Sequence, residues 1–158
     1  KVHVRRGLRV LPKLRSDAAS WGRQSLADLG EEGFSDAMLR ASVGDPFSES
    51  TPETALADLR ELIDAAGSAF DPHDWFVVGD VRGDIGVVLP HLFADRRTTG
   101  TLWYLGVLPE RRGHGYGTQL HLLGLHRLRN LGALDYVGST DTANEPMLRV
   151  FARNGCAS

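Results

Sequence analysis

A glycine-rich stretch with two arginines is the part of the sequence whose residue types best fit ligand chemistry. It reads RRGHGYG over residues 111–117 and runs directly into a leucine-rich segment with helical periodicity. The first turn of a helix exposes unpaired backbone N–H groups, and glycines let those amides approach a ligand closely. Arginines nearby add positive charge for phosphate oxygens. The stretch therefore predicts a seat for a phosphate or pyrophosphate group, with a plain flexible turn as the alternative.

The spacing of these glycines excludes the two commonest phosphate motifs. The sequence has no G-x-x-x-x-G-K-S/T loop, and it has no G-x-G-x-x-G fingerprint after an early strand. It does contain Arg112-x-x-Gly115-x-Gly117, which matches the acetyl-CoA signature Gln/Arg-x-x-Gly-x-Gly/Ala. Together with the preceding LGVLPERR and the downstream STDTANEPMLRVFARNGC, this signature resembles the GNAT family of N-acetyltransferases. The resemblance covers about residues 74–156.

The resemblance implies a set of contacts with acetyl-CoA, each carried over by position. The loop amides would bind the pyrophosphate, the Leu105 amide would stabilise the developing oxyanion, and Val107 would pair with the pantetheine arm. Asn144 would contact the pantetheine region, and capping of the last helix is its alternative role. The predicted donor site comprises Leu105, Val107, Arg111, Arg112, Gly113, His114, Gly115, Tyr116, Gly117, Thr118, Asn144 and Phe151.

Two positions at which family members carry proton-transfer groups differ in this sequence. Many members have a tyrosine seven residues after the motif asparagine, and this chain has Phe151 there. Some have a glutamate base eleven residues before the signature, and this chain has Thr101. Direct transfer needs a neutral amine, so another group must take its proton. The candidates are His91, Tyr104 and Asp141, each with an ordinary structural role as the alternative.

Composition places the chain among ordinary globular proteins. It has 158 residues, of which 42% are hydrophobic and 24% charged, and its formal net charge is −2. No apolar run is long enough for a membrane span, and no residues have metal-ligand spacing, so we expect neither a membrane anchor nor a metal. The single cysteine, Cys156, leaves no internal disulfide, and it favours a cytoplasmic location.

Charge is distributed unevenly along the chain. Residues 1–15 carry six Lys or Arg and no acids, whereas residues 16–80 carry fourteen Asp or Glu against three Arg. If the acidic region forms the acceptor side, it would attract a cationic amine on a small molecule or peptide; a set of solvated faces is the alternative. No aromatic-rich basic surface indicates nucleic acid as a partner. A second copy of the chain, in a homodimer, is a further candidate partner.

The hydrophobic pattern predicts the elements that position these residues. Strands are expected at 2–11, 75–81, 85–93, 101–108 and 134–139, and helices at 16–29, 35–42, 52–66, 116–130 and 145–153. The strands at 75–81 and 85–93 form a hairpin that turns near Gly83-Asp84, and a polar loop, ADRRTTG, follows the hairpin. This order indicates a mixed α/β sheet flanked by helices. The resemblance implies the GNAT-like form of it, mostly antiparallel and splayed between its fourth and fifth strands.

The expected organisation is a single GNAT-like domain over residues 1–158. The family fold usually adds a hairpin after the last helix, and this sequence stops before one. That hairpin is therefore absent, supplied by a partner chain, or part of a longer protein, and the sheet edge must be covered. The expected function is acetyl transfer from acetyl-CoA to a primary amine by direct attack. The alternative, motivated by Phe151 and Thr101, is a non-catalytic acyl-CoA-binding or regulatory domain.

Overall fold

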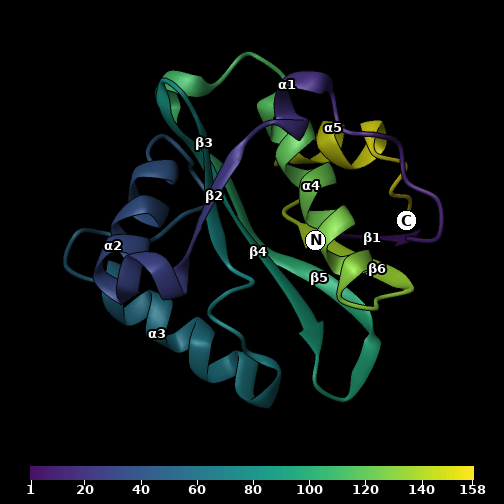
Figure 1. The fold of residues 1–158 in the computed structure, drawn as a ribbon, viewed down its shortest axis with the longest axis horizontal. Helices are drawn as coiled ribbons and strands as arrows, with labels where there is room; N and C mark the ends of the chain where they lie inside the picture. Colours follow the sequence, from purple (N-terminus) through teal and green to yellow (C-terminus); the bar gives the residue numbers. More distant parts are fainter.

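A six-stranded mixed sheet forms the centre of the computed structural model, which describes all of residues 1–158 (Figure 1). The strand order across the sheet is β1-β6-β5-β4-β3-β2. Along the chain the elements are β1 (Val2–Gly7), α1 (Ser16–Ala19), β2 (Gly22–Ser25), α2 (Leu26–Ala41), α3 (Ala55–Ala66), β3 (Phe76–Asp80), β4 (Gly83–Phe93), β5 (Arg96–Val107), α4 (Tyr116–Asn130), β6 (Asp135–Thr140) and α5 (Glu145–Arg153).

Helices cover both faces of the sheet, so the central strands β3 and β4 are buried on both sides (Figure 1). On one face α2 and α3 pack over a cluster that includes Val77 and Leu89. On the other face α4 packs over a cluster that includes Phe76 and Val88. Neighbouring strand residues thus serve opposite cores, as the two-residue period of a strand requires. The predicted fold class, a mixed sheet between layers of helices, is confirmed.

The predicted helix at 16–29 is wrong, because a short edge strand interrupts it. Helix α1 ends at Ala19, and after two further residues the four residues of β2, Gly22–Ser25, pair antiparallel with β3. Ser25 then starts α2 through a capping box: its hydroxyl accepts from the Asp28 amide, and the Asp28 carboxylate accepts from the Ser25 amide. The short helix predicted at 35–42 is the second part of α2, which kinks at Gly30 with a φ of 75°.

The polar loop predicted after the hairpin is also wrong. Strand β5 begins at Arg96, and only Ala94-Asp95 separates it from β4. The first residues of β5 are exposed, so their side chains show no apolar alternation, and their strand character comes from pairing with β4. The opening strand is shorter than predicted and ends at Gly7.

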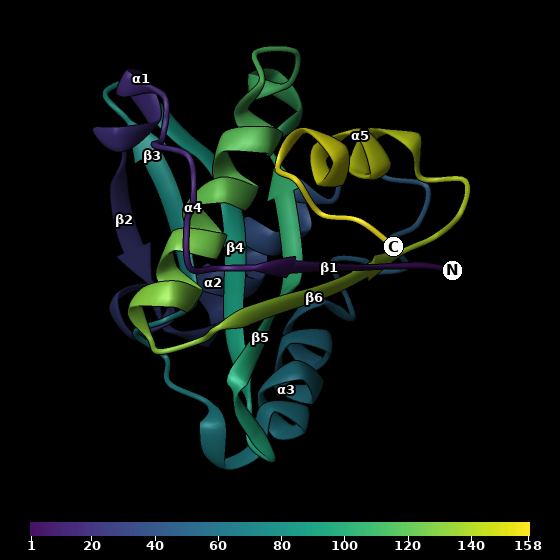
Figure 2. The same cartoon turned by 90° about the vertical axis from the view of Figure 1, so that its right-hand side faces the viewer.

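Strands β5 and β6 pair in parallel at one end only. Their paired residues are Thr99 with Asp135 and Gly100 with Tyr136, and beyond them the two strands diverge (Figure 2). The expected splay between these strands is therefore present. From Thr101 to Val107 the edge of β5 that faces β6 has no strand partner.

The edge of the sheet beside β6 is covered by the N-terminal strand. β1 runs antiparallel to β6 over six residue pairs, from Val2 with Thr140 to Gly7 with Asp135. On the far side of β1, Arg5 exchanges two backbone hydrogen bonds with Ala157. The side chains of Val4 and Leu8 join the core beneath α4 and α5.

Candidate active site

The RRGHGYG stretch connects β5 to α4 and leaves the first turn of α4 without a side-chain cap. Gly113 and Gly115 have φ values of 85° and 74°, in the left-handed region that side chains disfavour. Gly115 is the N-cap residue, and no side chain bonds the amides that follow it. Those N–H groups and the helix dipole make this end of α4 a site for an anion, as the motif predicts.

A cavity of about 450 Å³ opens between β5 and the N-terminal end of α5, beside this loop. It lies on the side where β5 has diverged from β6, so backbone groups of β5 face it without a strand partner. We call it the β5–α5 groove. Its lining comprises Ala41, Gly44, Asp45, Pro46, Phe47, Tyr104, Leu105, Gly106, Val107, Arg112, Gly117, Ala143, Asn144, Pro146, Met147 and Val150.

The two arginines of the motif have different surroundings. Arg111 is buried, ion-paired with Asp80, and bonded to the carbonyls of Gly83 and Asp84. The hydrogen bond from this guanidinium holds the pKa of the Asp80 carboxyl below its ordinary value. Arg111 thus anchors the turn between β3 and β4, and the structure does not bring it to the groove.

Arg112 lines the groove and fastens two elements together. Its Nε donates to the Val107 carbonyl at 3.1 Å, and its Nη2 donates to the carbonyls of Ala41 and Val43 at 3.1 and 2.6 Å. These bonds tie the C-terminal end of α2 to the end of β5. Three carbonyls hold the guanidinium in place. Arg112 therefore helps to fix the shape of the groove and also adds a positive charge to its lining.

The remaining loop residues divide between the core and the surface. The Tyr116 ring is buried against Trp21, with ring centroids 5.3 Å apart, and does not line the groove. His114 is exposed, and its carbonyl accepts a hydrogen bond of 3.1 Å from Arg15. Sequence reasoning missed Arg15, whose contact with the loop spans 99 residues and has no local signal. The Thr118 carbonyl accepts from Asn154.

Asn144 lines the groove and also caps α5. Its Oδ1 accepts from the Met147 amide at 3.3 Å, and its Nδ2 donates to Thr140 Oγ1 at 3.0 Å. Both roles considered for this residue are thus compatible with its position. Asp141 is exposed, bonds the Ala143 amide, and lines no cavity described here. The structure does not bring Asp141 to the groove.

Phe151 lies in the core, away from the groove. Its ring packs against His121, with centroids 5.7 Å apart, in a cluster beneath α4 and α5. His121 is fully buried between Tyr136 and Asn154. The predicted contact between Phe151 and a ligand is therefore not supported by its placement, because this part of α5 faces α4.

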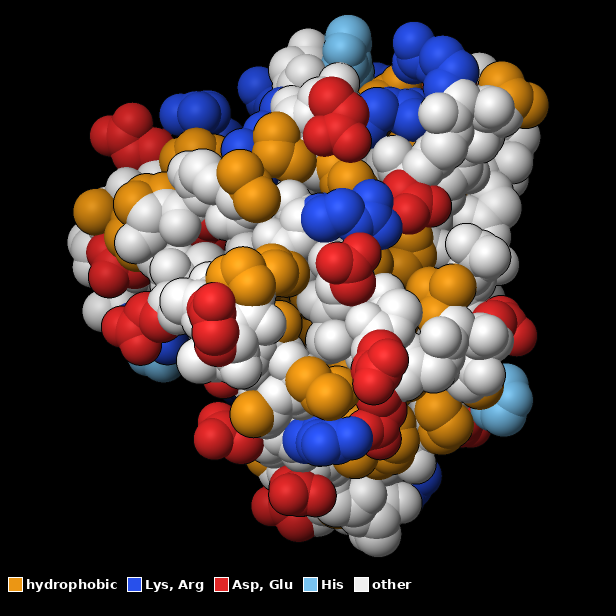
Figure 3. All heavy atoms as spheres, turned by 90° about the vertical axis from the view of Figure 1, so that its left-hand side faces the viewer, with side chains coloured by type: hydrophobic (Ala, Val, Ile, Leu, Met, Phe, Trp, Pro, Cys, Tyr) orange, Lys and Arg blue, Asp and Glu red, His pale blue; other side chains and the backbone are white.

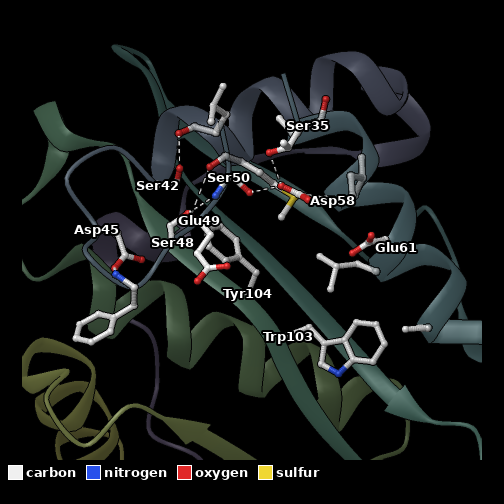
Figure 4. Close-up of a pocket in the computed structure, with 18 residues that line it drawn as sticks. Ser35, Ser42, Asp45, Ser48, Glu49, Ser50, Asp58, Glu61, Trp103 and Tyr104 are labelled. Carbon is white, nitrogen blue, oxygen red and sulfur yellow. Dashed lines mark hydrogen bonds between the residues drawn. The ribbon is translucent and has the colours of Figure 1, made fainter. Parts of the chain in front are cut away.

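A larger pocket of about 790 Å³ lies on the opposite side of Tyr104, between α2, α3 and β5 (Figure 4). We call it the α2–α3 pocket. Its lining contains four carboxylates and no Lys or Arg: Asp45, Glu49, Asp58 and Glu61. None of these carboxylates forms an ion pair with a basic side chain. Figure 3 shows acidic side chains spread over this helical layer.

The two cavities share three residues, Asp45, Phe47 and Tyr104. Tyr104 therefore stands at their junction, and its hydroxyl is 3.5 Å from the Met38 carbonyl. Burial, with a smaller contribution from Asp45, raises the pKa of Tyr104 well above its ordinary value. The hydroxyl stays protonated at neutral pH, so Tyr104 carries a proton that it can donate in a hydrogen bond and cannot act as a base.

His91 packs against Trp103, which lines the α2–α3 pocket, but does not line the pocket itself. It is buried, its ring lies 4.2 Å from that of Trp103, and it lines none of the three cavities. Burial lowers the pKa of His91, which keeps the ring neutral. Trp103 lines the α2–α3 pocket and also a third cavity of about 390 Å³, where His3 and Arg5 of β1 face Thr101.

A splayed sheet, with a glycine loop and an uncapped helix beside the splay, defines a class of transferases that bind acyl-CoA. Within that class, the sequence model of the acetyltransferase (GNAT) family matches residues 37–156. The chain belongs to the GNAT family. The resemblance drawn from the glycine motif is thereby confirmed, and the family's reaction is acetyl transfer from acetyl-CoA to an amine.

Curated relatives carry the name mycothiol acetyltransferase. The one from Mycobacteroides abscessus is 32% identical over 157 residues, covering 98% of this chain and 51% of the relative. The one from Streptomyces bingchenggensis is 31% identical over 105 residues, covering 66% of this chain and 34% of the relative. The chain thus spans about half, or less, of the length of these relatives.

Solved structures show the same fold. A GCN5-related N-acetyltransferase from Sphaerobacter thermophilus superposes with a TM-score of 0.69 at 17% identity, covering 98% of this chain and 47% of that one. At this identity the likeness concerns the fold alone. None of the helices has the length and apolarity needed to cross a membrane.

Proposed function

We propose that this chain transfers an acetyl group from acetyl-CoA directly to a cationic amine. The observation that carries the proposal is the junction of two cavities at Tyr104. One cavity runs along unpaired backbone of β5 to the uncapped start of α4, and the other is lined by unpaired carboxylates. A donor in the first and an acceptor in the second would meet beside Leu105, without an acyl-enzyme intermediate.

The donor half of the site is built mainly from backbone. Amides of residues 113–118 would hold the pyrophosphate, because two of the glycines turn the chain and no side chain caps the helix. The free edge of β5 would pair with the pantetheine arm at Val107, and the Leu105 amide would bind the thioester oxygen. Arg112 would shape this groove, and Asn144 would border it through the start of α5.

The acceptor half of the proposed site is the α2–α3 pocket, which is lined by acidic and aromatic side chains. Four carboxylates without basic partners produce a negative potential that attracts a cationic amine. Trp103 and Tyr104 add ring faces to which a cation is also attracted. A small-molecule amine and a peptide amine both fit these properties. The name of the curated relatives makes an acceptor of the mycothiol type one further amine to test.

Tyr104 would supply the proton that the departing sulfur needs. Its hydroxyl stays protonated, and it lies at the junction where the thioester would sit. No such donor is available from Phe151, which is enclosed by the core. The thiol of Cys156 is buried, and burial raises its pKa to about 11, so it is excluded as an acyl carrier. We place the protein in the cytoplasm, where an unpaired thiol is ordinary.

Turnover and binding, measured separately, test this proposal. Thiol release from acetyl-CoA is followed over a panel of spermidine, glucosamine, a short peptide with a free N-terminus and a mycothiol-type amine. Stabilisation of the chain by CoA is followed in parallel by thermal unfolding. We expect CoA to raise the unfolding midpoint and at least one amine to be acetylated. Stabilisation without turnover on any amine favours the alternative, a non-catalytic acyl-CoA-binding or regulatory domain.

A further inference from the structure

One carboxylate lies where the two cavities meet. Asp45, on the segment between α2 and α3, lines both the β5–α5 groove and the α2–α3 pocket. The other carboxylates of the pocket do not reach the groove, and the groove has no second acidic residue. An amine that enters through the α2–α3 pocket to attack a thioester in the groove would therefore pass Asp45 at the boundary.

The structure holds the Asp45 side chain in place through its own segment. Arg112 fixes the backbone just before it by donating hydrogen bonds to the Ala41 and Val43 carbonyls, and Gly44 turns with a φ of 80°. The Asp45 amide donates to the Ser42 carbonyl at 3.0 Å. One carboxylate oxygen, Oδ1, accepts from the Phe47 amide at 2.9 Å. The second oxygen has no hydrogen-bond partner in the protein and is available to a ligand.

No basic side chain is ion-paired with Asp45. Tyr104 faces it from β5, Arg112 lies beyond the end of β5, and Glu49 follows on the same segment. Arg112 is engaged by three carbonyls and forms no ion pair with Asp45. The carboxylate therefore has no fixed countercharge, and an incoming ammonium would supply one.

The other acids of the pocket are placed differently. Asp58 lines the pocket but not the groove, and its Oδ2 accepts hydrogen bonds from the Ser50 and Thr54 hydroxyls at 2.7 and 2.9 Å. Figure 4 shows Glu61 on the Trp103 side of the pocket, away from Asp45. Glu49 is exposed on the same segment as Asp45 but lines only the pocket. These three can attract a cation, whereas Asp45 alone borders the donor.

We propose that Asp45 is the general base that removes a proton from the acceptor ammonium. The assignment rests on the proposed function. The ammonium gives one proton to the Asp45 carboxylate, which later releases it to water, and the neutral nitrogen bonds to the thioester carbon. As the tetrahedral intermediate collapses, the carbon–sulfur bond breaks, and the nitrogen loses a second proton. The sulfur takes a proton from Tyr104, which is reprotonated by that second proton through solvent, so the products are amide, CoA thiol and one proton.

The test compares two amines that differ in their need for a base. One is the panel amine that the wild-type chain acetylates fastest among those protonated at neutral pH. The other is hydroxylamine, which is already mostly neutral at about pH 7.5 and needs little help to lose a proton. Asp45→Asn should lower kcat for the protonated amine by about 10²–10⁴-fold and hydroxylamine turnover by only a few-fold. The acidic limb of the kcat/KM profile should disappear for the first amine.

Glu49→Gln is the matched control, since it removes a carboxylate from the same segment and pocket. It should raise KM for the cationic amine and leave the pH profile unchanged. Asp45→Glu keeps a carboxylate and should recover part of the lost turnover. This variant still tests the role of the carboxylate if Asp45→Asn folds poorly. CoA-dependent stabilisation checks that each variant keeps its donor site.

Two results would overturn the assignment. Equal loss of turnover on both amines indicates a structural role for Asp45, and unchanged turnover on both indicates no role. If the wild-type chain acetylates neither amine, the proposed function itself fails, and the assignment of a base fails with it.

Discussion

Trp103 and Tyr104 are consecutive residues of β5, yet both face the α2–α3 layer. The pairing of β5 with β4 explains this, because Leu105 pairs with Val88 and Leu102 with Pro90. Two residues of β5 therefore lie opposite the single residue Leu89, which makes a β-bulge. The bulge directs two aromatic rings into the α2–α3 pocket and returns Leu105 to the α4 side.

Removing the Tyr104 hydroxyl should slow acetyl transfer without weakening donor binding. In Tyr104→Phe we expect kcat to fall by about 10²-fold, because the departing sulfur loses its proton donor. The unfolding midpoint should change little, since the only hydrogen bond lost is the 3.5 Å contact with Met38. Steady-state kinetics and CoA titration measure the two effects. A normal kcat would remove Tyr104 from the reaction.

Gly113→Ala should weaken CoA binding more than it weakens the fold. Gly113 has a φ of 85° and open space around its Cβ position, so the strain of an added side chain is about 1–2 kcal/mol. Gly132→Ala is a matched control, because Gly132 has a φ of 104°, equally open surroundings and a place at the far end of α4. Both variants should lose similar stability in urea, and only Gly113→Ala should lose CoA affinity. Equal CoA affinity in both would contradict the role of the loop.

The adjacent arginines should respond in opposite ways to replacement by methionine. Arg111→Met breaks a buried ion pair and leaves Asp80 without its partner, so the unfolding midpoint should fall by several degrees. Arg112→Met frees the end of α2 and the segment that carries Asp45, so KM for the acceptor should rise at least several-fold with a smaller change in midpoint. Thermal unfolding and kinetics on both variants give the comparison. The reverse pattern would show that Arg112 is the structural residue.

Acid should destabilise the fold through His121. Its complete burial lowers the pKa to about 4 from 6.5, so only the unfolded chain binds a proton between these values. The contribution of the neutral ring is therefore complete above about pH 6.5 and is lost as the pH falls toward 4. At 1.36 kcal/mol per pKa unit this amounts to about 3 kcal/mol. Urea unfolding at several pH values measures the slope, which His121→Gln should flatten. An unchanged slope in the variant would assign the effect to other groups.

The glycine motif predicted the part of the site that depends on local sequence. Gly113 and Gly115 turn the chain as expected, and α4 begins at the predicted residue. The same motif could not distinguish Arg111 from Arg112, because their difference depends on Asp80 and Ala41, which are distant in the sequence. Sequence periodicity alone does not report such contacts.

Pairing between strands accounts for the elements that sequence reasoning missed. β2 has only four residues, and its strand character comes from β3. The Ser25 and Asp28 capping box was a readable signal for the start of α2, and it was obscured by the helical periodicity expected from residue 16. The bulge at Trp103 is set by register with β4, which no property of β5 alone specifies.

The pairing of β1 with β6 gives the chain a particular order of assembly. β1 precedes the other strands of the sheet in the sequence, but its partner β6 lies more than 120 residues later, and Ala157, which also pairs with β1, comes later still. While β2 to β5 are being synthesised, β1 therefore has no β6 strand with which to form hydrogen bonds. Long-range closure of this kind is slow compared with local folding. Because β1, β5 and β6 all line the third cavity, that cavity forms only after β1 has paired with β6.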